Sequence, residues 1–537
     1  MSRTTPAGTP LGDGFHVFDT TLRDGAQREG ITYSVTDKLA VARLLDGIGV
    51  GFIEGGWPGA LPKDTEFFAR AAAGELELKH AVLVAFGSTR KAGVKVEDDK
   101  QVQALLDSQA PVVTLVAKSD RRHIERALRT DVDENCAMVA DTVRHLVANG
   151  RRVFLDAEHF FDGYAYDPEC SLRVLQAAGE AGADVVVLCD TNGGQLPVGL
   201  GQIVTEVMAR TGLRVGIHCQ DDTSCAVANT IAAVQAGATH VQCTANGYGE
   251  RAGNADLFAV VGNLVTKLGM PVLPTDSVAE LTRVSHALAE IANIAPDTHQ
   301  AYVGASAFAH KAGLHASAIK VDPDLYNHID PVTVGNGMRV LVTEMAGRAS
   351  LELKGRELGL DLAGRPDAVG SAVRKVKELE ARGWSFEAAD ASLELLLRNE
   401  LSEVDEPPFT LESYRVLLDH RQDDVIVSEA TVKVHVGGER VIATAEGNGP
   451  VHALDAALRQ ALRPHLSWMD SVELADYKVR ILTDHPGTDA ITRVLVESTD
   501  GEHVWTTVGV HDNIVEASWL ALCDALAHKA MRVRALA

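Results

Sequence analysis

A cation and a carboxylate stand side by side after the first apolar run of the chain. The segment from Phe18 to Gly30 reads FDTTLRDGAQREG and contains Arg23 followed by Asp24. At the mouth of a barrel, such a pair can hold a divalent metal and polarise a bound carbonyl group. A strand followed by Arg-Asp-Gly is also how an ordinary turn is written. The segment by itself therefore indicates either metal-assisted carbonyl chemistry or a plain turn.

Polar residues recur at the ends of other apolar runs. If those runs are parallel strands of a barrel, their carboxyl ends share the face on which such folds carry their chemistry. We therefore expect one site to be built from Arg23, Asp24, Glu54, Glu158, Asp190, Thr191, the stretch from His218 to Asp222, Asn246, Glu250, Arg251 and Asn254.

Four of these residues form a candidate metal site. His218 and Gln220 are two residues apart in an extended segment, so both side chains point to one face. With Asp24 and Asn254 they offer one imidazole, one carboxylate and two amide oxygens, a set that suits Mg²⁺ or Mn²⁺ better than structural zinc. A single histidine often only forms hydrogen bonds inside a polar barrel mouth. Four candidate ligands from three strand ends favour the metal site.

The elements that must position these residues are eight short β-rich runs between Phe15 and about Lys267. They read FHVFD, VGFIEG, LKHAVLVAF, PVVTLVA, RRVFLD, DVVVLCD, LRVGIHC and THVQCT. Between them lie segments whose apolar residues recur every three or four positions, as helices require. Eight strand-helix units in about 250 residues predict an α/β fold with a (β/α)8 TIM barrel. A doubly wound open sheet is the competing interpretation.

The remainder of the chain has a different pattern. Residues 277–401 read as mainly helical connector segments, and the acidic, proline-containing SEVDEPPF from Ser402 to Phe409 marks a boundary. A β-β-helix pattern then occurs twice, about 63 residues apart, with Gly438 aligned to Gly501, which predicts an α+β module with an internal repeat. We expect a flexible terminus at 1–14, a catalytic barrel at 15–275, linker subdomains at 276–408 and a regulatory domain at 409–537.

Composition excludes several classes of protein. A formal net charge of −24 over 537 residues disfavours binding to nucleic acid. No run of about 18 apolar residues predicts a membrane span, and the first residues lack the apolar stretch of a signal peptide, so we expect a cytoplasmic protein. Seven scattered cysteines without a Cys-x-x-Cys pair argue against disulfides or thiolate zinc.

The motifs together resemble one family, the metal-dependent Claisen-type synthases that include 2-isopropylmalate, homocitrate and citramalate synthases. DTTLRDGAQ, the histidine motif after the seventh run and NGYGERAGN resemble the whole superfamily. Four further segments look like those of the citramalate synthases: IEGGWPG, LCDTNGG, FAHKAGLHASA and YNHIDPVTVGN. The resemblance runs from about Phe15 to the C-terminus. It implies a homodimeric acyltransferase that condenses acetyl-CoA with pyruvate and water to give (R)-citramalate and CoA.

The resemblance also implies roles for residues within the barrel. Asp24, His218 and Asn254 match metal ligands, and Arg23 matches the group that polarises the carbonyl of the 2-oxo acid. Glu158 matches an acid that pairs with this arginine. Thr191 resembles the hydroxyl donor to the substrate carboxylate.

Outside the barrel, His315 and Tyr326 resemble a pair that helps to deprotonate acetyl-CoA. In the family, the connector that carries this pair reaches over the partner subunit's barrel. The repeated module resembles a feedback domain, for which isoleucine is the expected effector if citramalate is the product.

One position departs from the family pattern. Where the family has His-x-His-Asn-Asp, this chain has His218, Cys219, Gln220, Asp221 and Asp222. An amide is a weaker, neutral oxygen donor than the imidazole it replaces. We interpret Gln220 as an exchanged metal ligand, with lost catalysis as the alternative.

The sequence is also compatible with other functions. Within the family, 2-isopropylmalate or homocitrate synthesis would differ only in the side chain of the 2-oxo acid. A hydroxyacyl-CoA lyase uses a similar barrel in the cleavage direction. Outside enzymology, an amino-acid-sensing protein with an inactive barrel would also explain Gln220.

Overall fold

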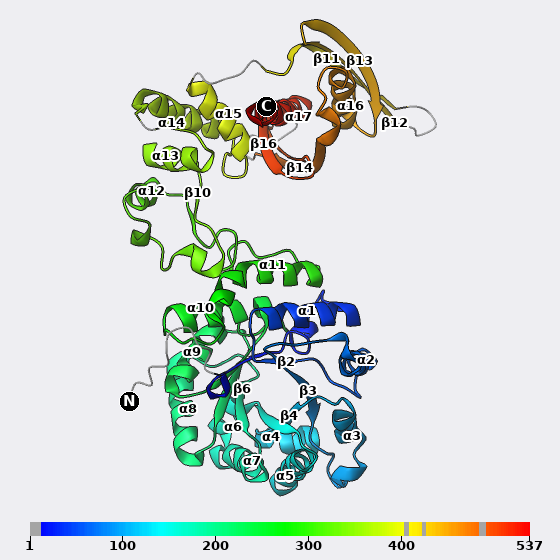
Figure 1. Ribbon diagram of the computed structural model, residues 1–537, viewed down its shortest axis with the longest axis vertical. Helices are drawn as coiled ribbons and strands as arrows, with labels where there is room; N and C mark the ends of the chain where they lie inside the picture. Colours follow the sequence, from blue (N-terminus) through cyan, green and yellow to red (C-terminus); the bar gives the residue numbers. More distant parts are fainter. Residues whose placement is uncertain (1–11, 363, 402–406, 421–425, 483–489, 537) are drawn as a thin grey trace. The chain divides into compact units, whose positions relative to one another are not determined.

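The computed structural model of this protein describes residues 12–362, 364–401, 407–420, 426–482 and 490–536. Most of the terminus expected to be flexible and most of the expected boundary segment SEVDEPPF therefore lie outside the described residues. The described residues pack as two compact units, one within residues 1–308 and 329–337, the other within 309–328 and 338–537. Figure 1 labels helices and strands of both units.

The first unit is a closed barrel of eight parallel strands in sequence order. The strands are β1 (His16–Asp19), β2 (Phe52–Glu54), β3 (Val82–Ser88), β4 (Val112–Lys118), β5 (Arg152–Glu158), β6 (Val185–Asp190), β7 (Val215–Cys219) and β8 (His240–Cys243). β8 pairs with β1, with Phe18 opposite Gln242, and this pairing closes the barrel. The predicted (β/α)8 barrel is confirmed, and a doubly wound open sheet is excluded.

Helices surround this barrel. They are α1 (Val35–Gly47), α2 (Pro62–Arg70), α3 (Lys100–Asp107), α4 (Arg121–His123), α5 (Val132–Ala148), α6 (Phe160–Tyr166), α7 (Pro168–Ala181), α8 (Pro197–Thr211), α9 (Ala226–Ala236) and α10 (Leu257–Thr266). Their starts follow local chemistry: Ser34 and Asp37 form a capping box before α1, and α2, α7 and α8 carry proline in the first turn. α11 (Leu281–Ala292) packs against α1 in the same unit.

The interior of the barrel is filled by side chains. An apolar cluster of eight buried residues occupies it, among them Phe18, Phe52 and Phe154. Because side chains alternate along a strand, the residues that follow each inward apolar position point toward the surrounding helices instead. The barrel is therefore a packed core, and polar chemistry is confined to its two ends.

The second unit begins with short elements and helices: β9 (Ala309–His310), α12 (Gly313–Ile319), β10 (Arg339–Val340), α13 (Arg348–Glu357), α14 (Pro366–Ala381) and α15 (Asp390–Glu400). Two repeats follow. The first comprises β11 (Thr410–His420), β12 (Ile426–Val436), β13 (Glu439–Gly447) and α16 (Pro450–Leu462); the second comprises β14 (Glu473–Ile481), β15 (Thr492–Thr499), β16 (Val504–His511) and α17 (Ile514–Leu536).

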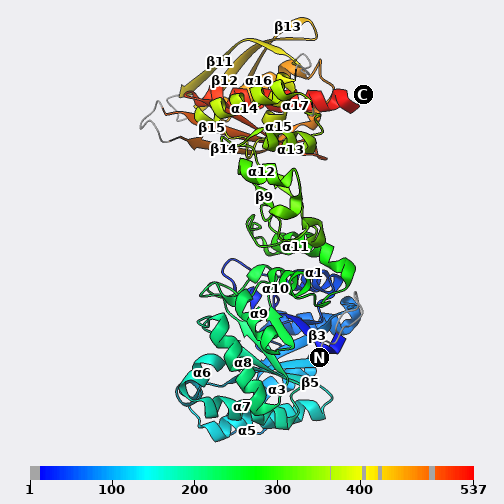
Figure 2. The same cartoon turned by 90° about the vertical axis from the view of Figure 1, so that its left-hand side faces the viewer.

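Each repeat has one strand more than the sequence pattern predicts. The expected order was β-β-helix, whereas each repeat is a three-stranded antiparallel sheet followed by a helix. The additional strands, β11 and β14, are edge strands with mostly exposed side chains, so they lack the alternation that identifies a half-buried strand. Figure 2 shows α16 and α17 between the two sheets. No helix among the described residues is long and apolar enough to cross a membrane.

Candidate active site

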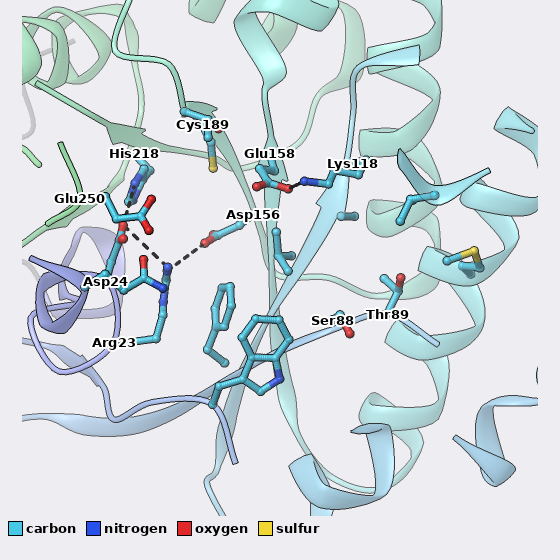
Figure 3. A pocket seen from close by; sticks show the side chains of 18 of the residues that line it. Arg23, Asp24, Ser88, Thr89, Lys118, Asp156, Glu158, Cys189, His218 and Glu250 are labelled. Carbon is cyan, nitrogen blue, oxygen red and sulfur yellow. Dashed lines mark hydrogen bonds and ion pairs between the residues drawn. The ribbon is translucent and has the colours of Figure 1, made fainter. Parts of the chain in front are cut away.

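A cavity of about 610 Å³ opens at the carboxyl ends of the barrel strands. Six of the residues selected from the sequence for a role in the reaction line it: Arg23, Asp24, Glu158, Thr191, His218 and Gln220. Figure 3 shows several of these side chains pointing toward one another from different strand ends. The volume lies within the range of ordinary small-molecule sites. The structure thus brings these six residues together at one cavity, whereas Glu54, Asp190, Asn246 and Asn254 do not line it.

The four candidate metal ligands lie in contact with one another. The Nε2 atom of His218 is 3.3 Å from Oδ2 of Asp24, and the side-chain amide of Gln220 donates to the same oxygen at 3.3 Å. Gln220 and Asn254 are joined by an isolated antiparallel β-bridge, which places the loop after β8 beside the end of β7. All four side chains are buried.

Two oxygens in this group have no hydrogen-bond partner among the described residues. They are Oε1 of Gln220 and Oδ1 of Asn254. The nitrogen of each amide is already engaged, with Asp24 for Gln220 and with the Tyr248 carbonyl for Asn254. A buried amide oxygen without a partner is costly, and a cation would satisfy both. The side chains present therefore fit a divalent metal.

The chemistry of this set is oxygen-rich and weakly charged. The described residues contain no group of three or more His, Cys, Asp or Glu side chains arranged to hold a metal. Any cation here would meet one carboxylate, one imidazole and amide oxygens. Such donors suit hard, oxygen-preferring cations better than thiolate-preferring ones.

The charges of the ligand pair depend on their neighbours. Burial acts to raise the pKa of Asp24, but the Arg23 guanidinium and hydrogen bonds from His218 and Asn254 hold it below its ordinary value. Burial acts to lower the pKa of His218, and the hydrogen bond with Asp24 more than compensates, so its pKa is raised. Asp24 is therefore a carboxylate at neutral pH.

Arg23 is held by acids while part of its guanidinium stays available. Its Nε donates to Oε2 of Glu54 at 2.7 Å, whereas its Nη atoms lie 3.7 Å from Asp24 and 3.9 Å from Asp156. The guanidinium carbon lies 3.8 Å from the centroid of the Phe86 ring, which fixes its plane. The two long distances leave Nη hydrogens for an oxygen bound in the cavity.

The expected pairing of Arg23 with Glu158 is wrong. Glu158 instead accepts a hydrogen bond from Lys118, across the β4 and β5 strand ends (Figure 3). Glu54 ends β2, which pairs with the strand leading to Arg23, and Asp156 lies two residues deeper than Glu158 on the same face of β5. Arg23 therefore lies beside Glu54 and Asp156 because of strand order and depth in the barrel, whereas Glu158 lines the cavity wall.

Thr191 is oriented by backbone groups. Its hydroxyl oxygen accepts from the backbone N–H of His159 at 2.8 Å, which leaves its hydrogen to donate. Its carbonyl accepts from Arg251 at 2.8 Å, and Arg251 also binds Asp222 through two nitrogens. These contacts hold the hydroxyl at the cavity wall.

His315 and Tyr326 belong to the second unit. Their rings stack with centroids 4.1 Å apart, and the ring of His310 lies 6.1 Å from that of His315. Tyr326 is 40% exposed. The structure brings these two residues together with each other, as a partly exposed pair.

Sequence reasoning missed two buried polar residues next to the cavity. Asp156 on β5 lines it, and Gln242 on β8 donates to Asp156 at 2.8 Å. Both occupy inward positions in strands that were recognised, so the period of two could have identified them. A polar residue at an inward position near the carboxyl end was the available signal.

Family models match nearly the whole chain. An HMGL-like model matches residues 14–289, a homocitrate synthase post-HMGL domain-like model matches 302–383, and the LeuA allosteric (dimerisation) domain matches 387–530. These matches follow one another in the chain without overlap.

Curated relatives match over the full length. An (R)-citramalate synthase of Streptomyces coelicolor is 62% identical over 98% of both chains. An (R)-citramalate synthase of Aquifex aeolicus is 46% identical over 96% of this chain and 98% of the relative. A 2-isopropylmalate synthase of Dictyoglomus turgidum is 30% identical over 95% of this chain and 97% of the relative.

Proposed function

Because the chain belongs to the (R)-citramalate synthase family, we propose that it condenses acetyl-CoA with pyruvate and water to give (R)-citramalate and CoA. The observation that carries this proposal is the 62% identity over 98% of both chains, in a protein whose Arg23, Asp24, His218 and Asn254 gather at one end of the barrel. The chain is an acyl-CoA-using transferase with a divalent metal, as in its family. The identity of that metal is part of the proposal.

Asp24, His218, Gln220 and Asn254 would hold the metal, with Mg²⁺ or Mn²⁺ preferred over Zn²⁺. The unpartnered oxygens of Gln220 and Asn254 support this assignment. When bound, a divalent cation supplies Lewis-acid polarisation of a carbonyl oxygen. Gln220 is thus proposed as an exchanged ligand that retains binding.

The wall of the cavity would orient the 2-oxo acid. The free Nη hydrogens of Arg23 would donate to the keto oxygen and stabilise the negative charge that develops there on attack. The hydroxyl of Thr191 would donate to the substrate carboxylate. Glu158, held by Lys118, would present a carboxylate beside the reacting carbon and take part in proton transfer.

His315 and Tyr326 would act on acetyl-CoA. The imidazole of His315, with Tyr326 stacked on it, would accept a proton from the acetyl methyl group, and the resulting enolate would attack the keto carbon. Water then cleaves the thioester and releases CoA. We propose that this pair serves the barrel of a partner subunit in a homodimer, a proposal supported by the match to a dimerisation domain.

The function of His315 has a direct test. We expect His315→Ala to reduce turnover by about 10²- to 10⁴-fold, the usual contribution of a general base. His299→Ala, at an exposed histidine of the barrel unit, is the control and should change turnover by less than about threefold. A His315→Ala enzyme as active as this control would show that the proton is taken elsewhere.

The repeats would form the regulatory part. We propose the division 15–275, 276–408 and 409–537 for catalytic barrel, linker and regulatory domain, with isoleucine as the feedback effector of the last. The match of residues 387–530 to an allosteric domain supports the regulatory role of the last part of the chain, and it begins before residue 409. Inhibition of the full chain by isoleucine, compared with valine and leucine at equal concentration, tests the effector. No inhibition by isoleucine would contradict it.

Substrate choice is tested by steady-state rates of CoA release with four acids. Pyruvate should give the highest kcat/KM, ahead of 2-oxobutyrate, 2-oxoisovalerate and 2-oxoglutarate. A preference for 2-oxoisovalerate would instead indicate 2-isopropylmalate synthesis, and a preference for 2-oxoglutarate homocitrate synthesis. No CoA release with any acid would favour a sensor, and cleavage of a hydroxyacyl-CoA would favour a lyase.

A further inference from the structure

We propose that Gln242 is a positioning residue that joins the two halves of the candidate active site. It would fix the tautomer in which His218 presents Nε2 to the metal, and it would hold Asp156 beside Arg23. This inference rests on the metal site of the proposed function. It assigns a role to a side chain that contacts neither the expected metal nor the substrate.

The barrel register places Gln242 between these groups. It is on β8, opposite His218 in the parallel β7 and β8 pair, and only 1% of it is exposed. Its Oε1 lies 3.0 Å from Nδ1 of His218, and its Nε2 donates to Oδ1 of Asp156 at 2.8 Å. Both ends of the amide are therefore engaged by functional neighbours.

The orientation of the Gln242 amide determines which ring nitrogen of His218 carries the hydrogen. Because Nε2 of Gln242 donates to a carboxylate, its carbonyl end faces the imidazole and can only accept. Nδ1 of His218 must then carry the hydrogen, and in the neutral ring Nε2 carries a lone pair. That nitrogen lies 3.3 Å from Asp24 and 3.4 Å from the amide nitrogen of Gln220. A metal-binding histidine is commonly fixed by such a contact through its other nitrogen.

The other end of the amide supports the arginine. Asp156 is buried, and Gln242 donates to it while Arg23 lies 3.9 Å away. Burial and the charge of Glu54 raise the pKa of Asp156, whereas His218, Arg23 and the hydrogen bond from Gln242 lower it, and the resulting pKa is about 7. The hydrogen bond from Gln242 opposes this shift and favours the carboxylate that faces Arg23. One amide thus contacts the metal half and the carbonyl half of the site.

Two variants separate these effects. Gln242→Leu removes both contacts, whereas Gln242→Glu retains an acceptor for Nδ1 of His218. Calorimetric titration of the metal-free full-length protein with Mn²⁺ measures how far the contact with His218 contributes to metal binding. We expect Gln242→Leu to weaken binding by about 10- to 100-fold, as is typical for residues that orient a ligand. Gln242→Glu should bind Mn²⁺ within about threefold of the parent.

Thr114→Val provides the matched control. Thr114 is also buried in the barrel, and its hydroxyl has no partner among the described residues, so this substitution should leave Mn²⁺ binding unchanged. If folded Gln242→Leu binds as tightly as this control, or if Gln242→Glu binds as weakly as Gln242→Leu, Gln242 does not set the tautomer.

A spectroscopic readout needs no variant. In the parent protein labelled with ¹⁵N-histidine, neutral His218 should show a protonated Nδ1 and an unprotonated Nε2. A protonated Nε2 in the neutral ring would overturn the proposal even if Gln242→Leu fails to fold. Failure of the parent to bind Mn²⁺ would contradict the proposed metal site, and the tautomer would still decide the role of Gln242.

Discussion

Buried histidine and arginine side chains lie at both ends of the barrel interior, but only those at the carboxyl end border the candidate active-site cavity. At the amino end, Nδ1 of His16 lies 3.1 Å from Nδ1 of His240, and Arg152 and Arg214 approach the other nitrogen of His16. The ring of Phe18 lies 5.0 Å from the ring of His240. At the carboxyl end, buried histidine and arginine instead border a cavity of about 610 Å³.

The difference lies in what the polar atoms face. Nε2 of His240 has no hydrogen-bond partner among the described residues, and its ring lies against the rings of Phe18 and Phe154. The unpartnered oxygens of Gln220 and Asn254 instead lie beside a carboxylate and an imidazole. Residue type therefore does not distinguish the two ends, whereas the two unsatisfied amide oxygens beside a carboxylate and an imidazole do.

Replacing one arginine at each end of the barrel should give the largest difference in kcat between the two ends. We expect Arg23→Gln to lower kcat by about 10²- to 10³-fold, because it removes donors to the developing oxyanion. Arg214→Gln at the amino end should lower stability and leave kcat within about threefold. Equal losses of kcat in both variants, measured by CoA release, would remove the functional distinction between the ends.

Substitutions of Gln220 should have the next largest effect. Gln220→Leu should weaken Mn²⁺ binding by about 10- to 100-fold, the scale of losses around metal sites. Gln220→His should shift the preference toward Zn²⁺, because imidazole suits zinc. Competition between Mn²⁺ and Zn²⁺ in calorimetry measures both. If neither substitution changes binding, Gln220 is not a ligand.

A smaller effect is expected at the cavity wall. Thr191→Val should reduce kcat/KM for pyruvate about tenfold, near the lower limit for a hydrogen bond to a charged group. Thr205→Val, on the outer helix α8, is the control. A Thr191→Val enzyme with the kcat/KM of this control would place the substrate carboxylate elsewhere.

The buried histidines at the amino end should affect the free energy of unfolding and leave turnover unchanged. Burial and the charge of Arg214 lower the pKa of His16 from 6.5 to about 4, and burial lowers the pKa of His240 as well. The unfolded chain therefore binds more protons in this range, and stability is lost as pH falls from 6.5 toward 4. Each histidine contributes a slope of at most about 1.4 kcal/mol per pH unit, reached where the unfolded state binds one full proton more than the folded state.

The double variant His16→Gln/His240→Gln tests that slope. Chemical unfolding between pH 7 and pH 5 should show a weaker pH dependence in this variant than in the parent. An equal slope in both proteins would assign the acid sensitivity to other groups.

Much of this arrangement could be predicted from sequence. Alternating strand and helix patterns predicted the barrel, and the rule that chemistry follows parallel strands selected Arg23, Asp24, His218, Gln220 and Asn254. These features depend on local periodicity and chain order, which a sequence displays directly. Their catalytic and metal-binding roles remain predictions.

Other features could not be predicted because they depend on how deep a side chain lies in the barrel or on which strands form the edge of a sheet. The partners of Arg23 are Glu54 and Asp156 instead of Glu158, because strand order and depth within the barrel decide which carboxylate is nearest. Gln242 was missed because the rule was applied to residues at or after the end of each strand, whereas Gln242 lies within β8. β11 and β14 were missed because exposed edge strands lack alternation.

The most direct test of the difference between the two ends is calorimetric titration of the metal-free protein with Mn²⁺. The parent and His16→Gln should each bind one Mn²⁺ per chain. Asp24→Asn should lose more than about 100-fold in affinity, beyond the loss expected for a residue that only supports a ligand. Absence of binding to the parent, or equal binding by parent and Asp24→Asn, would contradict the assignment of a metal site to the carboxyl end.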